Sequence, residues 1–76
     1  MITFEDFYAE VLQAMDQRPD HYRKGQAVFN YIDENYGVAR YVQFVEGIDC
    51  FFDDDQINPF IYYSYIALDR FNALNQ

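Results

Sequence analysis

Residues 53–74, DDDQINPFIYYSYIALDRFNAL, join the densest acidic cluster of the chain to its densest aromatic cluster. From Pro59 onward, apolar residues recur at steps of three and four, which is the spacing of one face of an α-helix. They form two neighbouring stripes, Phe60, Tyr63, Ala67, Phe71 and Leu74 on one and Ile61, Tyr65 and Leu68 beside it. Because other elements must cover so wide an apolar arc, the pattern predicts an all-α fold, a compact bundle of three to four helices with this C-terminal helix at its centre.

Two starts are open for this C-terminal helix. Asn58 followed by Pro59 has the residue types that are favoured at the N-cap and at the first helical position. An earlier start at Asp53 or Asp54 is the alternative, because carboxylates favour the positive end of a helix dipole.

The N-terminal segment predicts a helix that ends near Gln17. Thr3, followed three residues later by Asp6, resembles a capping box, and Glu5 and Asp6 fall in the first turn. Pro19 then interrupts the pattern because it disfavours a helical residue before it and has no amide hydrogen. The apolar residues of this helix recur at helical spacing: Phe4, Phe7, Tyr8, Val11, Leu12 and Met15.

A second helix is predicted from His21 or Arg23 to Tyr36, with Asp20 as a candidate cap. Gly25 lies inside it, where glycine costs about 1 kcal/mol relative to alanine, and a close helix–helix contact would explain its presence. Gly37 stands where a left-handed residue is expected after a helix end.

Residues 38–46 predict a shorter helix that Gly47 ends, although valines at three of these positions also suit a strand. On a helix, Val38, Val42 and Val45 would share one side, with Tyr41 and Phe44 beside them. Residues 48–52 are largely apolar, and we interpret them as a buried connector. Since no repeat or linker is visible, residues 1–76 are predicted to form a single domain.

The charge of the chain restricts the functions open to it. Thirteen acidic side chains against five basic ones give a formal net charge of −8. This balance argues against direct binding of nucleic acid and against an anionic membrane surface, and it suits a protein partner with a basic surface. The longest largely apolar run, residues 59–68, is about half of the roughly 20 residues that a membrane span needs.

The cysteine content and the first residues indicate a compartment. Cys50 is the one cysteine, which excludes an internal disulfide and suits a reducing environment. The opening residues 1–6 have neither the basic region nor the apolar region of a signal peptide. We therefore expect a cytoplasmic protein.

No motif in the sequence supports catalysis. Cys50 and His21 would act as nucleophile and base only if the fold brought them together. His21 belongs with Arg18, Arg23 and Lys24 to the one basic cluster, which we interpret as a solvated turn, an anion site at a helix N-terminus being the alternative. Gly-rich phosphate loops, Cys pairs, His pairs and Ser nucleophile motifs are absent from the sequence. We expect a protein that is not an enzyme and needs no cofactor.

The acidic residues from 46 to 55 have three interpretations. Asp49 and the three consecutive aspartates could ligate a hard cation, but an EF-hand loop begun at Asp49 would need Gly at the position of Asp54 and Glu at that of Phe60, so no metal site is predicted. Capping of the last helix explains the same carboxylates without a ligand. A binding surface is the third interpretation. It includes local imitation of DNA, although a net charge of eight is below the about 17 charges of a duplex as long as this domain.

The tyrosines favour a binding surface. The chain has eight of them, more than one small core can bury with every hydroxyl hydrogen-bonded, and aromatic side chains are enriched at binding hot spots. We therefore predict a non-catalytic protein–protein interaction module. The alternative is a structural homo-oligomer, such as a homodimer, assembled through the aromatic C-terminal helix. The predicted partner-binding residues are Glu46, Asp49, Asp53, Asp54, Asp55, Tyr62 and Tyr63.

Two segments resemble a pattern in small uncharacterised proteins of phages and bacterial genomes. Residues 23–30, RKGQAVFN, are similar to their Arg-x-Gly-Gln-x-x-Phe-Asn motif, and Asp49, Phe51, Asp53 and Asp54 are similar to their Asp-x-Phe-x-Asp-Asp segment. The resemblance covers about half of the chain. It implies no activity, but it implies a phage or mobile-element origin, in which short acidic proteins act as inhibitors or adaptors by binding a host protein.

Overall fold

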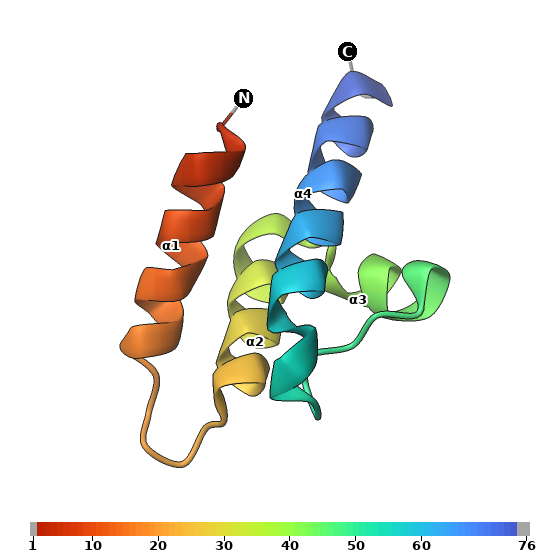
Figure 1. The fold of residues 1–76 in the computed structure, drawn as a ribbon. Coiled ribbons are helices and arrows are strands. Elements are labelled where there is room, and N and C mark those ends of the chain that lie inside the picture. The colour runs from red at the N-terminus through yellow and green to blue at the C-terminus, as the bar shows by residue number, and fades with distance from the viewer. Residues whose placement is uncertain (1, 75–76) are drawn as a thin grey trace.

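The helices found in the structure confirm the all-α prediction. The structure is a computed structural model that describes residues 2–74, so residues 1, 75 and 76 of the predicted domain lie outside the described part. Within residues 2–74 no strand is present (Figure 1). The elements are α1 (Phe4–Asp16), α2 (Lys24–Tyr36), α3 (Ala39–Tyr41), the π-helical turn η1 (Val42–Glu46), the 3-10 turn η2 (Asp54–Gln56) and α4 (Ile57–Leu74).

Two helices share the centre of the bundle. α4 contacts α1, α2, η1 and η2, while α2 contacts α1, α3, α4 and η2. Figure 1 shows α1, α2 and α4 as three neighbouring columns, with α3 and η1 on the side away from α1. The core between them is built from side chains that include Phe7, Ile32, Val42, Phe60 and Ile61. None of the helices within residues 2–74 has the length and apolar content that crossing a membrane requires.

The predicted start of α1 is confirmed. Thr3 is the N-cap, and its hydroxyl accepts a hydrogen bond of 3.2 Å from the amide of Asp6. This bond satisfies one of the amide groups that the first helical turn leaves without a partner. Phe7 and Val11 are the fully buried residues of the helix, as the helical spacing predicts.

The predicted cap of α2 is wrong. Asp20 lies in a turn closed by the amide of Tyr22 and the carbonyl of Pro19, and the helix begins four residues later at Lys24. Arg23 is the N-cap residue and provides no side-chain bond. At the other end, Gly37 adopts the expected left-handed conformation, with φ at 71°, and its amide donates to the carbonyls of Ile32 and Asp33.

Residues 39–46 are helical and no strand is present in the predicted segment 38–46, but the predicted valine face holds only in part. Val38 and Val42 are buried, whereas Val45 and Phe44 are exposed. The cause is the π turn, in which the amide of Gly47 donates to the carbonyl of Val42, five residues back. Such a turn contains an extra residue, so Val45 is carried out of register with Val42.

The start of α4 corrects a second capping prediction. The 3-10 turn η2, with Asp53 as its N-cap, runs directly into α4, so helical structure begins at Asp54, as the earlier of the two predicted starts has it, while the α-helix itself begins at Ile57. Asn58 is therefore not the cap, and its side-chain oxygen instead accepts a hydrogen bond from the hydroxyl of Tyr8. Pro59 lies in the first turn, where a missing amide hydrogen breaks no helical bond. Of the predicted apolar stripes, Phe60, Ile61 and Ala67 are fully buried and Leu74 is exposed.

Candidate interaction surface

A hollow lined by phenylalanines opens on the surface between α2, η1 and the segment that precedes η2. We call it the aromatic hollow; its volume is ≈ 240 Å³, and its lining residues are Phe29, Arg40, Gln43, Phe44, Phe51 and Phe52. Phe29 is almost completely buried and forms its floor, whereas Phe44 is 79% exposed and Phe52 is 74% exposed. Large apolar side chains held this far into solvent are a mark of binding surfaces.

Ring contacts hold the floor of the aromatic hollow. The ring of Phe29 packs edge-on against Phe51 with centroids 5.5 Å apart, and its other neighbour is Phe60 of the core, also at 5.5 Å. Phe51 in turn packs against Phe52 at 4.8 Å. The hollow is therefore anchored to the core through Phe29, while its rim at Phe52 depends on the position of the segment from residue 48 to residue 53.

Gly25 fixes the position of that segment. A Cβ atom at residue 25 would lie 1.9 Å from the carbonyl oxygen of Cys50, so only glycine leaves room for the segment to pack against α2. The buried thiol of Cys50 donates to the carbonyl of Gly25 at 3.2 Å. The close neighbour of Gly25 is thus the backbone of the connector and not the helix that the sequence suggested.

Two further bonds join the start of α2 to the same segment. The Asp54 carboxylate accepts a hydrogen bond of 2.9 Å from the amide of Gly25, and it thereby takes the capping role that the N-cap residue of α2 leaves open. The guanidinium group of Arg23 donates to the carbonyl of Phe51 and lies 5.7 Å from the ring centroid of Phe52. Residues 23–25 and residues 50–54 therefore pack against each other.

Three of the five predicted acidic binding residues accept hydrogen bonds from their own chain. Asp49 accepts from the side-chain amide of Gln43 and from the amide of Phe51, at 3.0 and 2.8 Å. Asp53 accepts from the amide of Asp55 at 3.0 Å, and Asp54 caps α2. Capping thus explains part of this cluster, although Asp54 acts on α2 and not on the last helix. Glu46 and Asp55 are exposed, and their carboxylates accept no bond within residues 2–74.

Neither of the two predicted tyrosines lines the aromatic hollow. Tyr62 is 52% exposed, and its ring packs on Phe4 of α1 and on its half-buried neighbour Tyr63. Phe60 faces Phe29, and a residue two positions further along an α-helix points about 200° away. Asp49 and Asp53 each adjoin a lining residue of the aromatic hollow, through the bond to Gln43 and through the chain next to Phe52, whereas Tyr62 lies on the α1 side of α4.

Most aromatic rings of α4 are covered by their own chain. Phe71 packs edge-on against Tyr41 at 5.0 Å. Tyr65 packs against Phe4 and Phe7, and its hydroxyl donates to the carbonyl of Ile2 at 2.8 Å. The large apolar side chains that α4 leaves exposed are Tyr62 and Leu74. These contacts leave less aromatic surface on this helix for a second copy than the sequence suggests.

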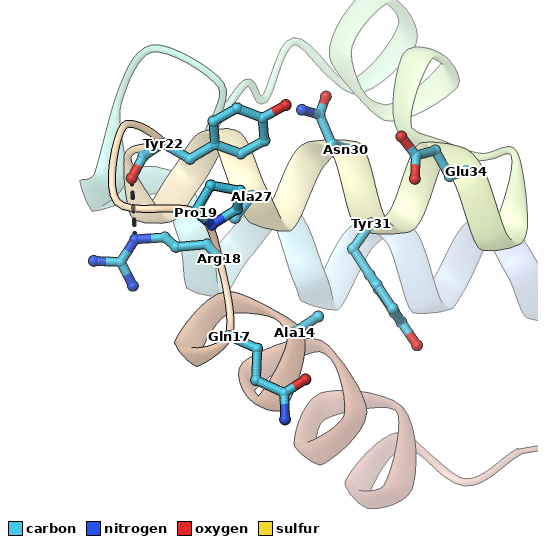
Figure 2. Close-up of a pocket in the computed structure, with 9 residues that line it drawn as sticks. All are labelled: Ala14, Gln17, Arg18, Pro19, Tyr22, Ala27, Asn30, Tyr31 and Glu34. Atoms are coloured by element: carbon cyan, nitrogen blue, oxygen red, sulfur yellow. Dashed lines mark hydrogen bonds between the residues drawn. The ribbon is translucent and has the colours of Figure 1, made fainter.

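A second hollow, of ≈ 410 Å³, lies between α1, α2 and the loop that joins them. Figure 2 shows the loop residues Arg18, Pro19 and Tyr22 at one end and Glu34 at the other. The Arg18 guanidinium donates to the carbonyls of Tyr22 and Met15, at 3.1 and 2.9 Å. Because two of its nitrogens close this loop, Arg18 acts as a structural residue here.

The titratable groups with displaced pKa values lie in the core and at its edge, not at the aromatic hollow. Burial, with the charge of Asp49 as the next cause, raises the pKa of the Cys50 thiol to about 12, so the thiol is neutral at physiological pH. Burial also raises the pKa of Tyr36, whose hydroxyl donates to Glu10. Within residues 2–74 no group of three or more His, Cys, Asp or Glu side chains is arranged to hold a metal ion.

Sequence reasoning missed the two exposed rim residues, Phe44 and Phe52. Residues 51 and 52 lie in bends, so strand alternation does not distinguish the half-buried Phe51 from the exposed Phe52. No local signal marks Phe44 either, whose exposure depends on the π turn. Comparisons with protein-family models, curated proteins and solved structures found no match to this chain.

Proposed function

We propose that this chain is a small acidic, non-catalytic interaction module that binds a protein with a basic surface through the face around the aromatic hollow. The observation that carries the proposal is the pair of phenylalanines Phe44 and Phe52, 79% and 74% exposed, which line one hollow together with the nearly buried Phe29. Exposing such rings to water is unfavourable, and aromatic anchors of this kind supply much of the binding energy of protein interfaces.

The charge of the chain supports the nature of the partner. The formal net charge is −8, and residues 46–55 contain five carboxylates and no basic side chain. The negative electrostatic potential of these groups speeds the approach of a basic partner and repels an acidic one. The resemblance to phage proteins extends the proposal to an inhibitor or adaptor of a host protein in the cytoplasm.

The proposal is tested by affinity capture from a bacterial lysate with three immobilised baits. They are the wild type, the double variant Phe44→Ser/Phe52→Ser and the variant Leu74→Ser. Leu74 is 75% exposed on α4, so its replacement removes one exposed apolar side chain away from the aromatic hollow. Circular dichroism and the melting temperature establish that the variants are folded.

We expect one protein to be retained by the wild type and by Leu74→Ser, and to be lost by the double variant. Its purified form should bind the wild type more weakly as salt concentration rises. Equal retention by all three baits would remove the aromatic hollow from the binding surface. Recovery of the chain's own copy alone, with a dimer in sedimentation, would favour the homo-oligomer over the proposed function.

A further inference from the structure

We propose that the aromatic hollow receives one apolar side chain from a partner segment that carries Lys or Arg on both sides of that residue. The inference rests on the proposed function and specifies what its partner must contain. It is argued from the size of the hollow, from the state of the polar groups at its edge and from the carboxylates beside it.

The size of the hollow suits a side chain. Pockets for small molecules and cofactors usually occupy about 300–1,000 Å³, whereas the aromatic hollow measures ≈ 240 Å³. Its floor is the nearly buried ring of Phe29, with Phe51 packed edge-on beside it. A single apolar residue placed between the two exposed rims would cover both Phe44 and Phe52, as hot-spot residues do in protein interfaces.

Two polar side chains at the hollow, Gln43 and Arg23, donate hydrogen bonds within the chain. The side-chain amide of Gln43 donates to Asp49, and Arg40 lies 3.8 Å from the carboxylate of Asp33. Arg23, at the edge beside Phe52, donates to the carbonyl of Phe51. An apolar group that enters the hollow asks for no hydrogen bond from these side chains, so the bonds of Gln43 and Arg23 can stay in place.

The carboxylates next to the hollow determine what should flank the apolar residue. Glu46 follows Phe44 by two positions, Asp53 follows Phe52 directly, and Asp49 is bonded to a residue of the lining. Within residues 2–74 the one ion pair joins Arg40 to Asp33, so these carboxylates have no cation paired with them. Lys or Arg on both sides of the entering residue would meet these charges.

A second copy of the chain fits this face less well. Paired subunits with two-fold symmetry present the same surface to each other, so the interface would hold the five carboxylates of residues 46–55 from both copies. Like charges brought together in this way disfavour the pair. Complementary charge therefore selects a basic partner over self-association at the aromatic hollow.

The test is selection from a library of short random peptides, displayed on a surface, against the immobilised wild-type chain. Peptides that also bind Phe44→Ser/Phe52→Ser are removed. We expect the remaining peptides to share an apolar residue with Lys or Arg within a few positions on both sides. A synthetic peptide of this kind should bind the double variant at least about tenfold more weakly than the wild type, and should bind Leu74→Ser as well as the wild type. Changing its apolar residue to Ser, or its basic residues to Gln, should each weaken binding.

Other results would overturn the inference in distinguishable ways. Peptides that lack the basic flanks, or that bind the double variant as tightly as the wild type, would refute it and leave the proposed function standing if the lysate experiment retains a protein. Absence of any binding peptide, together with absence of a retained protein, would refute both. A dimer that the double variant disperses would replace the basic partner by a second copy.

Discussion

Gly25 has only a hydrogen atom as its side chain, and this lets the connector at Cys50 pack directly on α2. The carbonyl oxygen of Cys50 occupies the space that any side chain at this position would need, and Asp54 accepts the amide hydrogen of the same residue. One glycine thus lets the connector pack on α2 and lets the start of α2 find its cap. The rim of the aromatic hollow at Phe52 follows from this contact, because Phe52 lies two residues beyond Cys50.

Gly25→Ala should destabilise the chain although alanine is the better helix former. The added Cβ would lie 1.9 Å from the Cys50 oxygen and 2.9 Å from an Asp54 oxygen. Combining overpacking with a lost cap, we expect about 2–4 kcal/mol of lost stability, measured by urea unfolding. Gly37→Ala is the control, because nothing lies within 4 Å of its added Cβ and only the left-handed backbone costs about 1–2 kcal/mol. A Gly25→Ala variant as stable as the wild type would contradict the packing at this contact.

The buried thiol of Cys50 predicts a loss of stability in alkali. Burial, followed by the charge of Asp49, raises its pKa from 9.0 to about 12. Below pH 9 the thiol is protonated in both the folded and the unfolded chain, so its full contribution to the free energy of unfolding is present. As the pH rises from 9 towards 12, the unfolded chain releases this proton and the folded chain retains it, which lowers the free energy of unfolding.

Urea unfolding at several pH values tests this prediction. The tyrosines Tyr31 and Tyr36 also have raised pKa values from an ordinary value of 10.0, so the lower part of the alkaline range isolates the cysteine. Cys50→Ala should show a flatter decline than the wild type between pH 9 and 10. Parallel declines of the two proteins would show that the thiol is not the group responsible.

At the scale of the elements, the sequence predicted those helix ends whose signals are local. Thr3 with Asp6, Gly37 and Gly47 all act on residues within a few positions, and each ends or begins a helix where expected. The cap of α2 could not be predicted in this way, because its acceptor is Asp54, which lies 29 positions away. The π turn could not be predicted from the spacing of apolar residues, because it changes the number of residues per helical turn that the prediction assumes.

The hydrogen bond between Tyr8 and Asn58 tests the corrected start of α4. If Asn58 acts only through the Tyr8 hydroxyl, 2.9 Å away, Tyr8→Phe and Asn58→Ala should each cost at most about 1 kcal/mol and the double variant should cost no more than either alone. The measurement is a double-mutant cycle by urea unfolding. Additive losses would indicate that Asn58 also caps the helix.

At the scale of the whole molecule, the sequence predicted the fold class but not where the exposed aromatic rings gather. Helical spacing places both Phe60 and Phe44 on apolar helix faces. It does not show that Phe60 is buried and Phe44 exposed. Which of them meets the core depends on how η1 packs on α4 and how the connector packs on α2, and both are contacts between distant segments. The acidic cluster was visible in the sequence, whereas its division between capping and free carboxylates required the fold.

The balance of charge in the folded chain predicts that added salt raises its stability. Thirteen acidic groups face five basic ones, and the one ion pair within residues 2–74 spans 3.8 Å with an exposed arginine, so repulsion between carboxylates outweighs attraction. Raising sodium chloride from about 0.01 to about 0.15 M shortens the screening length from about 30 to about 8 Å and should raise the melting temperature. The variant Glu46→Lys/Asp55→Lys halves the formal net charge and should respond less to the same change. A melting temperature that falls with salt would mean that favourable charge pairs outweigh the repulsion.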